Sequence, residues 1–116
     1  MKYMLLIYND PSAWTDDPAE GEKMMAEYGT FTQGILESGE MVAGDPLQGI
    51  ETATSVRVRN GKTTTTDGPF AETKEHLGGY YIVDVKDLDR ALELGSQIPG
   101  AKNGTVEVRP IMEISG

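Results

Sequence analysis

Most of the side chains in this sequence that suit chemistry lie in one short segment. Between Asp67 and His76 the chain places three carboxylates, a lysine and its single histidine within ten residues. Carboxylates and histidine are the usual groups for moving protons in enzymes. Gly-Pro at the start and Gly-Gly at the end predict a shaped loop, and loops on rigid scaffolds often carry functional groups. The segment 67–79 is therefore the first candidate site.

Within this segment Asp67 is the expected functional carboxylate, because it ends a strand and precedes Gly-Pro. Lys74 is its expected charge partner, or the group that binds an acidic substrate. Glu72 is a further substrate-binding candidate, and His76 is a candidate general acid or base because histidine titrates near neutral pH. The alternative is structural: Asp67 caps the following turn, an ion pair holds the loop, and the glutamates are solvated surface charge.

Composition narrows the classes of function. The chain has 116 residues, 10 basic and 19 acidic, with a net charge of −9. Nucleic acid and anionic membranes would repel such a chain, so neither is an expected partner. The absence of cysteine excludes disulfides and thiolate chemistry, and one histidine excludes multi-histidine metal sites. No nucleotide-binding glycine motif appears, so we expect no cofactor and no metal. With no membrane span or signal peptide, the expected location is the cytoplasm.

Strands are predicted where apolar residues alternate or run together between turn residues. These segments are 3–8, 41–43, 56–59, 62–66, 80–85 and 106–109. Asn60-Gly61 separates two of them and predicts a tight type I′ hairpin turn, because both central residues of that turn need positive φ. The end of the loop at Gly78-Gly79 is expected to lie outside the sheet.

Two helices are predicted between these strands. The first begins after Asp17-Pro18, a capping residue followed by proline, and ends at Gly39. Its apolar stripe is Met24, Tyr28, Phe31 and Ile35. Gly29 and Gly34 on the same helix suggest that another backbone comes close. The second helix follows a cap at Asp87, and its expected inner residues are Leu88, Ala91, Leu92, Gly95 and Ile98.

This order of elements predicts a single α+β domain. A ferredoxin-like antiparallel sheet with two helices on one face satisfies it. The other face would expose valines and tyrosines, so we expect a homodimer, a dimeric α/β-barrel-like assembly. Tyr8 and Tyr28 are candidates to lend hydroxyls to a substrate pocket between sheet and helix, although the place of Tyr28 on the apolar stripe favours core packing for it. Trp14 is expected to cover the core edge or the dimer seam.

The segment from Asp67 to Gly79, followed by Tyr-Tyr-Ile-Val-Asp-Val at 80–85, resembles the signature of the DGPF subgroup of the YCII-related family. The segments 1–8, 42–44, 56–61 and 104–110 are similar to that subgroup at matching places. The resemblance covers essentially the whole chain. It implies a dimeric ferredoxin-like protein and no particular reaction, since most members of the subgroup have none assigned.

The wider YCII-related superfamily is similar to small aromatic-degrading enzymes that are proposed to use a His–Asp pair, with the histidine on the first helix. This sequence has Glu27 and Tyr28 near that place instead of histidine. His76 stands in the signature loop, where many members have glutamine, and does not replace it. Asp45, after Val-Ala-Gly at 42–44, lies near the expected place of the aspartate and is the third catalytic candidate.

Two functions stay open on the sequence. The first is a cofactor-free enzyme that uses acid–base chemistry on a small polar or aromatic substrate. The second is a non-catalytic ligand-binding or regulatory module, which the resemblance links to extracytoplasmic-function sigma factors. A perturbed carboxylate or histidine in a concave site would favour the enzyme, and a flat loop with paired surface charges would favour the module.

Overall fold

The structure, a computed structural model, describes residues 1–13 and 16–114, so Trp14 lies outside the described residues. Four strands form one antiparallel sheet in the order β2-β5-β1-β6. Their bounds are Lys2–Asn9 (β1), Met41–Pro46 (β2), His76–Asp84 (β5) and Thr105–Pro110 (β6). The helices are Pro18–Glu37 (α1) and Leu88–Gln97 (α2), with short 3₁₀ turns at Pro11–Ala13, Ile50–Thr52 and Pro99–Ala101.

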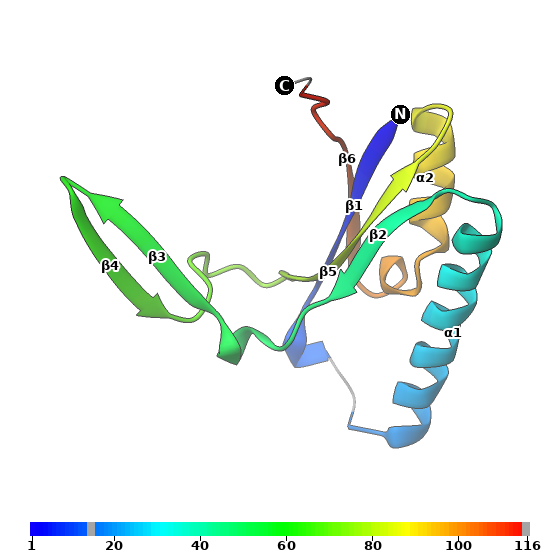
Figure 1. Cartoon of the computed structure of the whole chain (residues 1–116). Coiled ribbons are helices and arrows are strands. Elements are labelled where there is room, and N and C mark those ends of the chain that lie inside the picture. The colour runs from blue at the N-terminus through cyan, green and yellow to red at the C-terminus, as the bar shows by residue number, and fades with distance from the viewer. Residues whose placement is uncertain (14–15, 115–116) are drawn as a thin grey trace.

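The remaining two strands, Thr54–Arg59 (β3) and Lys62–Asp67 (β4), form a separate hairpin. Without this hairpin the chain runs strand, helix, strand, strand, helix, strand, which is the ferredoxin-like order. Both helices cover the same face of the four-stranded sheet (Figure 1). The predicted α+β architecture is therefore confirmed. No helix among the described residues is long and apolar enough to cross a membrane.

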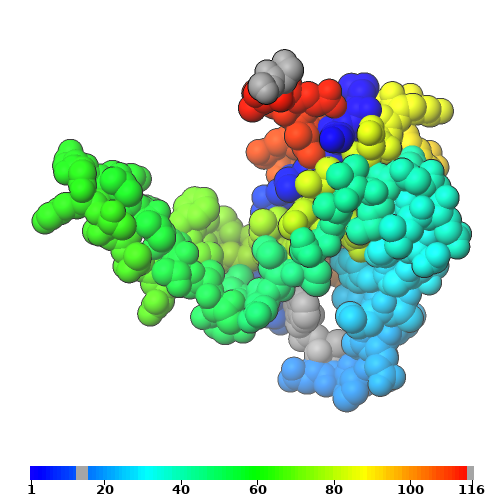
Figure 2. Space-filling view, viewed as in Figure 1, coloured from blue at the N-terminus to red at the C-terminus, as the bar shows by residue number. Residues whose placement is uncertain are grey.

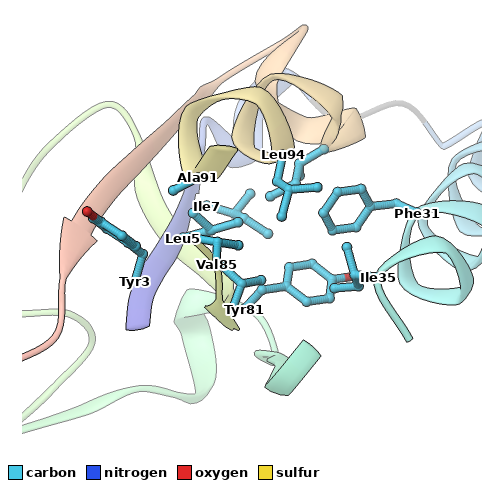
Figure 3. Close-up of a cluster of buried hydrophobic side chains, with 11 residues drawn as sticks. Tyr3, Leu5, Ile7, Phe31, Ile35, Tyr81, Val85, Ala91 and Leu94 are labelled. Atoms are coloured by element: carbon cyan, nitrogen blue, oxygen red, sulfur yellow. The ribbon is translucent and has the colours of Figure 1, made fainter. Parts of the chain in front are cut away.

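The core lies between the sheet and the two helices (Figure 3). Alternate residues of β1 supply its floor, because successive side chains of a strand point to opposite faces: Tyr3, Leu5 and Ile7 are all buried. From α1, Phe31 packs edge-on against Tyr81 with ring centroids 5.1 Å apart. The apolar stripe predicted on that helix thus faces the sheet.

Helix α1 begins and ends at the predicted residues. Asp17 caps it by accepting a hydrogen bond from the Ala19 N–H at 3.0 Å. Gly39 follows its end with φ of 78°. The prediction that Gly29 and Gly34 mark a close backbone is wrong, since nothing lies within 4 Å of a Cβ placed at either position.

The predicted inner face of α2 is correct only in part. Ala91, Gly95 and Ile98 are buried as expected, but Leu88 and Leu92 are 46% and 48% exposed. Leu94 is buried in their place. The reason is the helical period: position 94 lies three residues from Ala91 and shares its face, whereas position 92 is turned about 100° away.

We call the hairpin Thr54–Asp67 the arm. Its turn residues Asn60 and Gly61 have φ of 53° and 75°, which confirms the predicted type I′ geometry. The arm extends away from the sheet and helices (Figures 1 and 2). At its base, the Gly68 N–H donates to the Ala53 carbonyl at 2.7 Å and the Ser55 hydroxyl donates to the Gly68 carbonyl at 2.8 Å.

The predicted loop 67–79 begins where a strand ends, as expected, but it is shorter than expected at its other end. Asp67 is the last residue of β4, and His76 to Gly79 already belong to β5. Gly79 pairs with Ile7, and a Cβ there would stand 3.1 Å from the Asp45 carbonyl oxygen. The glycine therefore allows two strands to approach closely and does not form a turn.

Candidate functional site

The sheet has one face free of helices, which we call the open face. On β1, Met4, Leu6 and Tyr8 alternate with the buried core residues and so point to this face. Ile82 and Tyr80 of β5 do the same, since they stand directly opposite Met4 and Leu6. All five side chains are half-buried. The centre of the open face is thus largely apolar.

One row of residues crosses the open face from edge to edge. Asp45 on β2 stands opposite Tyr80, Tyr80 stands opposite Leu6, and Leu6 stands opposite Glu107 on β6. Residues that stand opposite each other in antiparallel strands share a face and lie side by side. The row therefore has an acidic residue at each edge and an aromatic and an aliphatic side chain between them.

At the β2 edge, the Tyr80 hydroxyl donates a hydrogen bond to Oδ2 of Asp45 at 2.6 Å. This bond raises the pKa of Tyr80, because the carboxylate stabilises the protonated phenol. The bond engages Oδ2, so Oδ1 is the second acceptor atom of the carboxylate. A carboxylate held by a protonated phenol is an arrangement suited to accepting and returning a proton.

At the β6 edge, Arg109 donates to Glu107 at 2.6 Å. The pKa of Arg109 is raised chiefly by this bond, with a smaller contribution from Tyr8. Tyr8 therefore belongs to the open face. Tyr28 packs against the core on the opposite, helical face, and burial raises the pKa of its hydroxyl. The two tyrosines lie on opposite sides of the sheet, and Tyr28 packs against the core, as its place on the apolar stripe predicts.

The signature segment does not gather its charges around Asp67. Asp67 is exposed at the base of the arm, where it stands opposite Thr54. Glu72 is exposed as well. Within the part of the chain that the structure describes, no ion pair joins Asp67 to Lys74. Phe70, between them, is 78% exposed.

Lys74 and His76 lie instead near the end of β1. Asp10 accepts hydrogen bonds from the Ser12 N–H at 2.9 Å and the Ser12 hydroxyl at 2.7 Å. These bonds are the main cause of its lowered pKa, and the charges of Lys74 and His76 lower it further. His76 itself pairs with Asn9 in the sheet. These two candidates are therefore brought together around Asp10 and not around Asp67.

Two hollows mark the surface on the helical side. The first, with a volume of about 580 Å³, lies between α1 and α2, and Glu27, Arg90 and Lys102 are among its lining residues. The second surrounds the ion pair of Glu40 and Arg90. Neither contains a predicted catalytic or binding residue. Among the described residues no group of three or more histidines and carboxylates is placed to hold a metal ion.

Sequence reasoning missed Tyr80. The alternation of β5 predicts that Tyr80 and Tyr81 point to opposite faces, but it does not say which carboxylate stands opposite Tyr80. That partner depends on the register between β2 and β5, whose paired residues here are 35 positions apart. The candidate site that the geometry favours therefore contains one predicted residue, Asp45, and one residue that only the structure reveals.

Comparison with known proteins gives two findings. The model of the YCII-related domain matches residues 1–115. A protein of Rhizobium meliloti (strain 1021), named only as uncharacterized, is 36% identical over 116 residues. The match covers 96% of this chain and 92% of that relative.

Proposed function

This chain belongs to the YCII-related family, and we propose that it is a cofactor-free enzyme that performs acid–base chemistry on the open face of the sheet. The hydrogen bond of 2.6 Å between Tyr80 and Asp45 carries this proposal. Asp45 is the base: it takes a proton from the substrate at Oδ1 and returns it to the product. Tyr80 is the positioning residue that orients the carboxylate through Oδ2. Asp67 lies on the separate hairpin and His76 four residues before Tyr80 on β5, and this mechanism uses neither of them.

The surroundings of the pair favour a small aromatic or polar substrate. Leu6 lies beside Tyr80 in the next strand, and Ile82 follows on the same face of β5. An aromatic ring packs well on such half-buried aliphatic side chains, and its acidic hydroxyl or C–H group then meets Asp45. Tyr8 and Arg109, further along the open face, offer a hydroxyl and a cation for a second polar group of the substrate.

The proposed enzyme is a cytoplasmic homodimer in which a second copy covers the open face. Half-buried Met4 is a side chain that such a contact would bury directly, while Leu6 and Ile82 would lie under the bound substrate between the two copies. The second copy also matters for the chemistry, because it would exclude water from Asp45, which is exposed in a single chain. Proton transfer is more effective where water is excluded. The signature at Asp67–Gly79 supports assignment to the DGPF subgroup.

One observation favours a second function, a non-catalytic ligand-binding or regulatory module. The signature segment presents Phe70 to solvent at 78% exposure, next to exposed Asp67 and Lys74. An exposed aromatic side chain between charges is typical of a protein-binding loop. Its partner under this reading is an extracytoplasmic-function sigma factor, as the family resemblance suggests.

A matched pair of variants separates the two functions. Asp45→Asn and Asp67→Asn make the same chemical change at two exposed aspartates, one on the open face and one at the base of the arm. Thermal unfolding of each is measured with a set of phenols and hydroxybenzoates. The enzyme reading expects a phenol to raise the melting temperature of the wild type and of Asp67→Asn by several degrees, but not that of Asp45→Asn.

The ligand found in this way is then incubated with each protein in heavy water, and deuterium incorporation is followed by NMR. Asp45→Asn should lower the exchange or turnover rate by at least about a hundredfold, the usual contribution of a general base. Tyr80→Phe should lower it less, because the carboxylate is kept and only its orientation is lost. If binding is lost in Asp67→Asn and kept in Asp45→Asn, the signature loop is the binding site and the enzyme reading is wrong.

A further inference from the structure

The arm lies in solvent on both of its faces. Ser55 is its only strand residue that is not exposed, and Val56 and Val58 are 61% and 57% exposed. A two-stranded ribbon is at best marginally stable in water unless another surface covers its apolar side. Because of this extension the radius of gyration is 16.2 Å, against about 13 Å for a compact chain of this length. The arm therefore has the form of an element that packs on a partner.

The register of the arm divides its side chains into two chemically different faces. One, the Val/Thr face, carries β-branched side chains that stand opposite each other in pairs: Val56 with Thr65 and Val58 with Thr63. The other, the basic face, carries the cations: Arg57, Arg59 and Lys62. The Val/Thr face suits a dry contact, and the basic face suits attraction at longer range.

Charge identifies the kind of surface that attracts the arm. The arm holds three of the ten basic residues of the chain and one of its nineteen acidic residues, Asp67 at its base. The rest of the chain keeps seven basic and eighteen acidic residues. A positive arm on a strongly negative body is complementary to the body of another copy. The same negative body opposes binding of the arm to nucleic acid.

The direction of the arm brings it to that second copy. The helices cover one face of the sheet, and the arm projects on the side of the open face (Figure 1). In the space-filling view it stands clear of the rest of the molecule (Figure 2). A second copy that covers the open face must therefore come within reach of the arm.

We propose that the arm is a clasp, which packs its Val/Thr face on the second copy of this chain while its basic face draws the two acidic bodies together. The proposal rests on the homodimer described under the proposed function. It names the segment that holds the dimer together, and the two forces involved, which are apolar packing and charge attraction. Each copy supplies one arm, so a symmetric dimer has two clasps.

Sedimentation equilibrium of the full chain tests the Val/Thr face. Val56→Thr with Val58→Thr keeps β-branched side chains of nearly the same shape, so the ribbon still forms, but it adds two hydroxyls to the buried contact. We expect the dissociation constant of the dimer to rise at least about tenfold, as for central apolar contacts in interfaces. The arm contributes no residue to the core. The double variant, measured as a monomer, should therefore keep the melting temperature of the wild-type monomer.

The basic face is tested by charge reversal. In the wild type the dissociation constant should increase with salt, because salt screens the attraction between arm and body. Arg59→Glu should weaken the dimer at low salt and flatten this dependence. Lys23→Glu, the same reversal of charge on exposed α1, is the matched control. It makes the body more negative, so the salt dependence of the dissociation constant should stay the same or become steeper.

Alkylation reports which face is covered, because the chain has no cysteine and a single introduced thiol is the only one present. Thr63→Cys places it on the Val/Thr face, and Thr64→Cys places it on the basic face one residue away. Above the dissociation constant, iodoacetamide should react several times more slowly with the first variant than with the second. Below it the rate of Thr63→Cys should rise and that of Thr64→Cys should change little, so each variant is compared with itself and the different acidity of the two thiols does not matter.

The clasp is disproved by any of three results. These are a wild type that is monomeric at every concentration, a Val/Thr variant with the wild-type dissociation constant, or an alkylation rate of Thr63→Cys that is the same above and below the dissociation constant. The proposed enzyme is judged separately, by phenol binding to Asp45→Asn. A dimer that forms without the arm removes the clasp and leaves that site intact.

Discussion

The hydrogen bond between Tyr80 and Asp45 predicts an observable titration. The bond raises the pKa of Tyr80 because the neighbouring carboxylate opposes formation of the phenolate. Asp45→Asn removes that charge, so the pKa of Tyr80 should fall towards the ordinary value of 10.0. Ultraviolet titration of the wild type and the variant, each compared with Tyr80→Phe to isolate this tyrosine, measures the change. An unchanged pKa means that the two side chains do not interact in solution.

A second pair at the residue scale controls stability. Arg90 donates from two nitrogens to both oxygens of Glu40, each at 2.8 Å, and this lowers the pKa of Glu40 from 4.5 to about 2. The ion pair stabilises the fold above about pH 4.5, where Glu40 is ionised in both states. As the pH falls towards 2 the unfolded state takes up the proton first, so this stability is lost.

We therefore expect Glu40→Gln to lower the free energy of unfolding at pH 7 by about 1–2 kcal/mol. Between pH 4.5 and 2 the difference from the wild type should shrink. Urea unfolding at a series of pH values measures both quantities. A difference that stays constant down to pH 2 contradicts the lowered pKa.

At the scale of the elements, two glycines, one within α1 and one after its end, test whether helix propensity or backbone conformation decides the effect of an alanine substitution. Gly29 is exposed in mid-helix with open space around its Cα, so Gly29→Ala should raise the free energy of unfolding by about 0.5–1 kcal/mol. Gly39 also has open space, but its φ of 78° is unfavourable for alanine. Gly39→Ala should therefore lower the free energy by about 1 kcal/mol. Chemical denaturation of both variants shows whether each substitution raises or lowers the free energy of unfolding.

The elements themselves were predictable because their signals are local. The alternation in β1, the cap at Asp17 and the Asn60-Gly61 turn each need only a few neighbouring residues. The end of the signature loop was predicted wrongly for the same reason. Gly78-Gly79 reads locally as a turn, whereas Gly79 pairs with Ile7 and Pro46, residues on strands much earlier in the chain.

At the scale of the whole molecule, the fold class followed from the order of elements, but the candidate site did not. Asp45 was proposed only through family resemblance, and its partner Tyr80 required the register of two strands. The arm was predicted as a hairpin, yet its projection from the sheet depends on the absence of pairing with the other four strands. Spacing within a segment carries no information about such distant pairing.

The strand order also governs when this protein can fold during its synthesis. Strand β1 is the first to be made, yet its two neighbours in the sheet, β5 and β6, are the last. Until residue 110 has left the ribosome, the most apolar strand of the chain has an unpaired edge. While these strands are being synthesised, Leu5 and Ile7 therefore wait for both neighbours of β1, and apolar surface exposed in this way favours wrong association in the nascent chain.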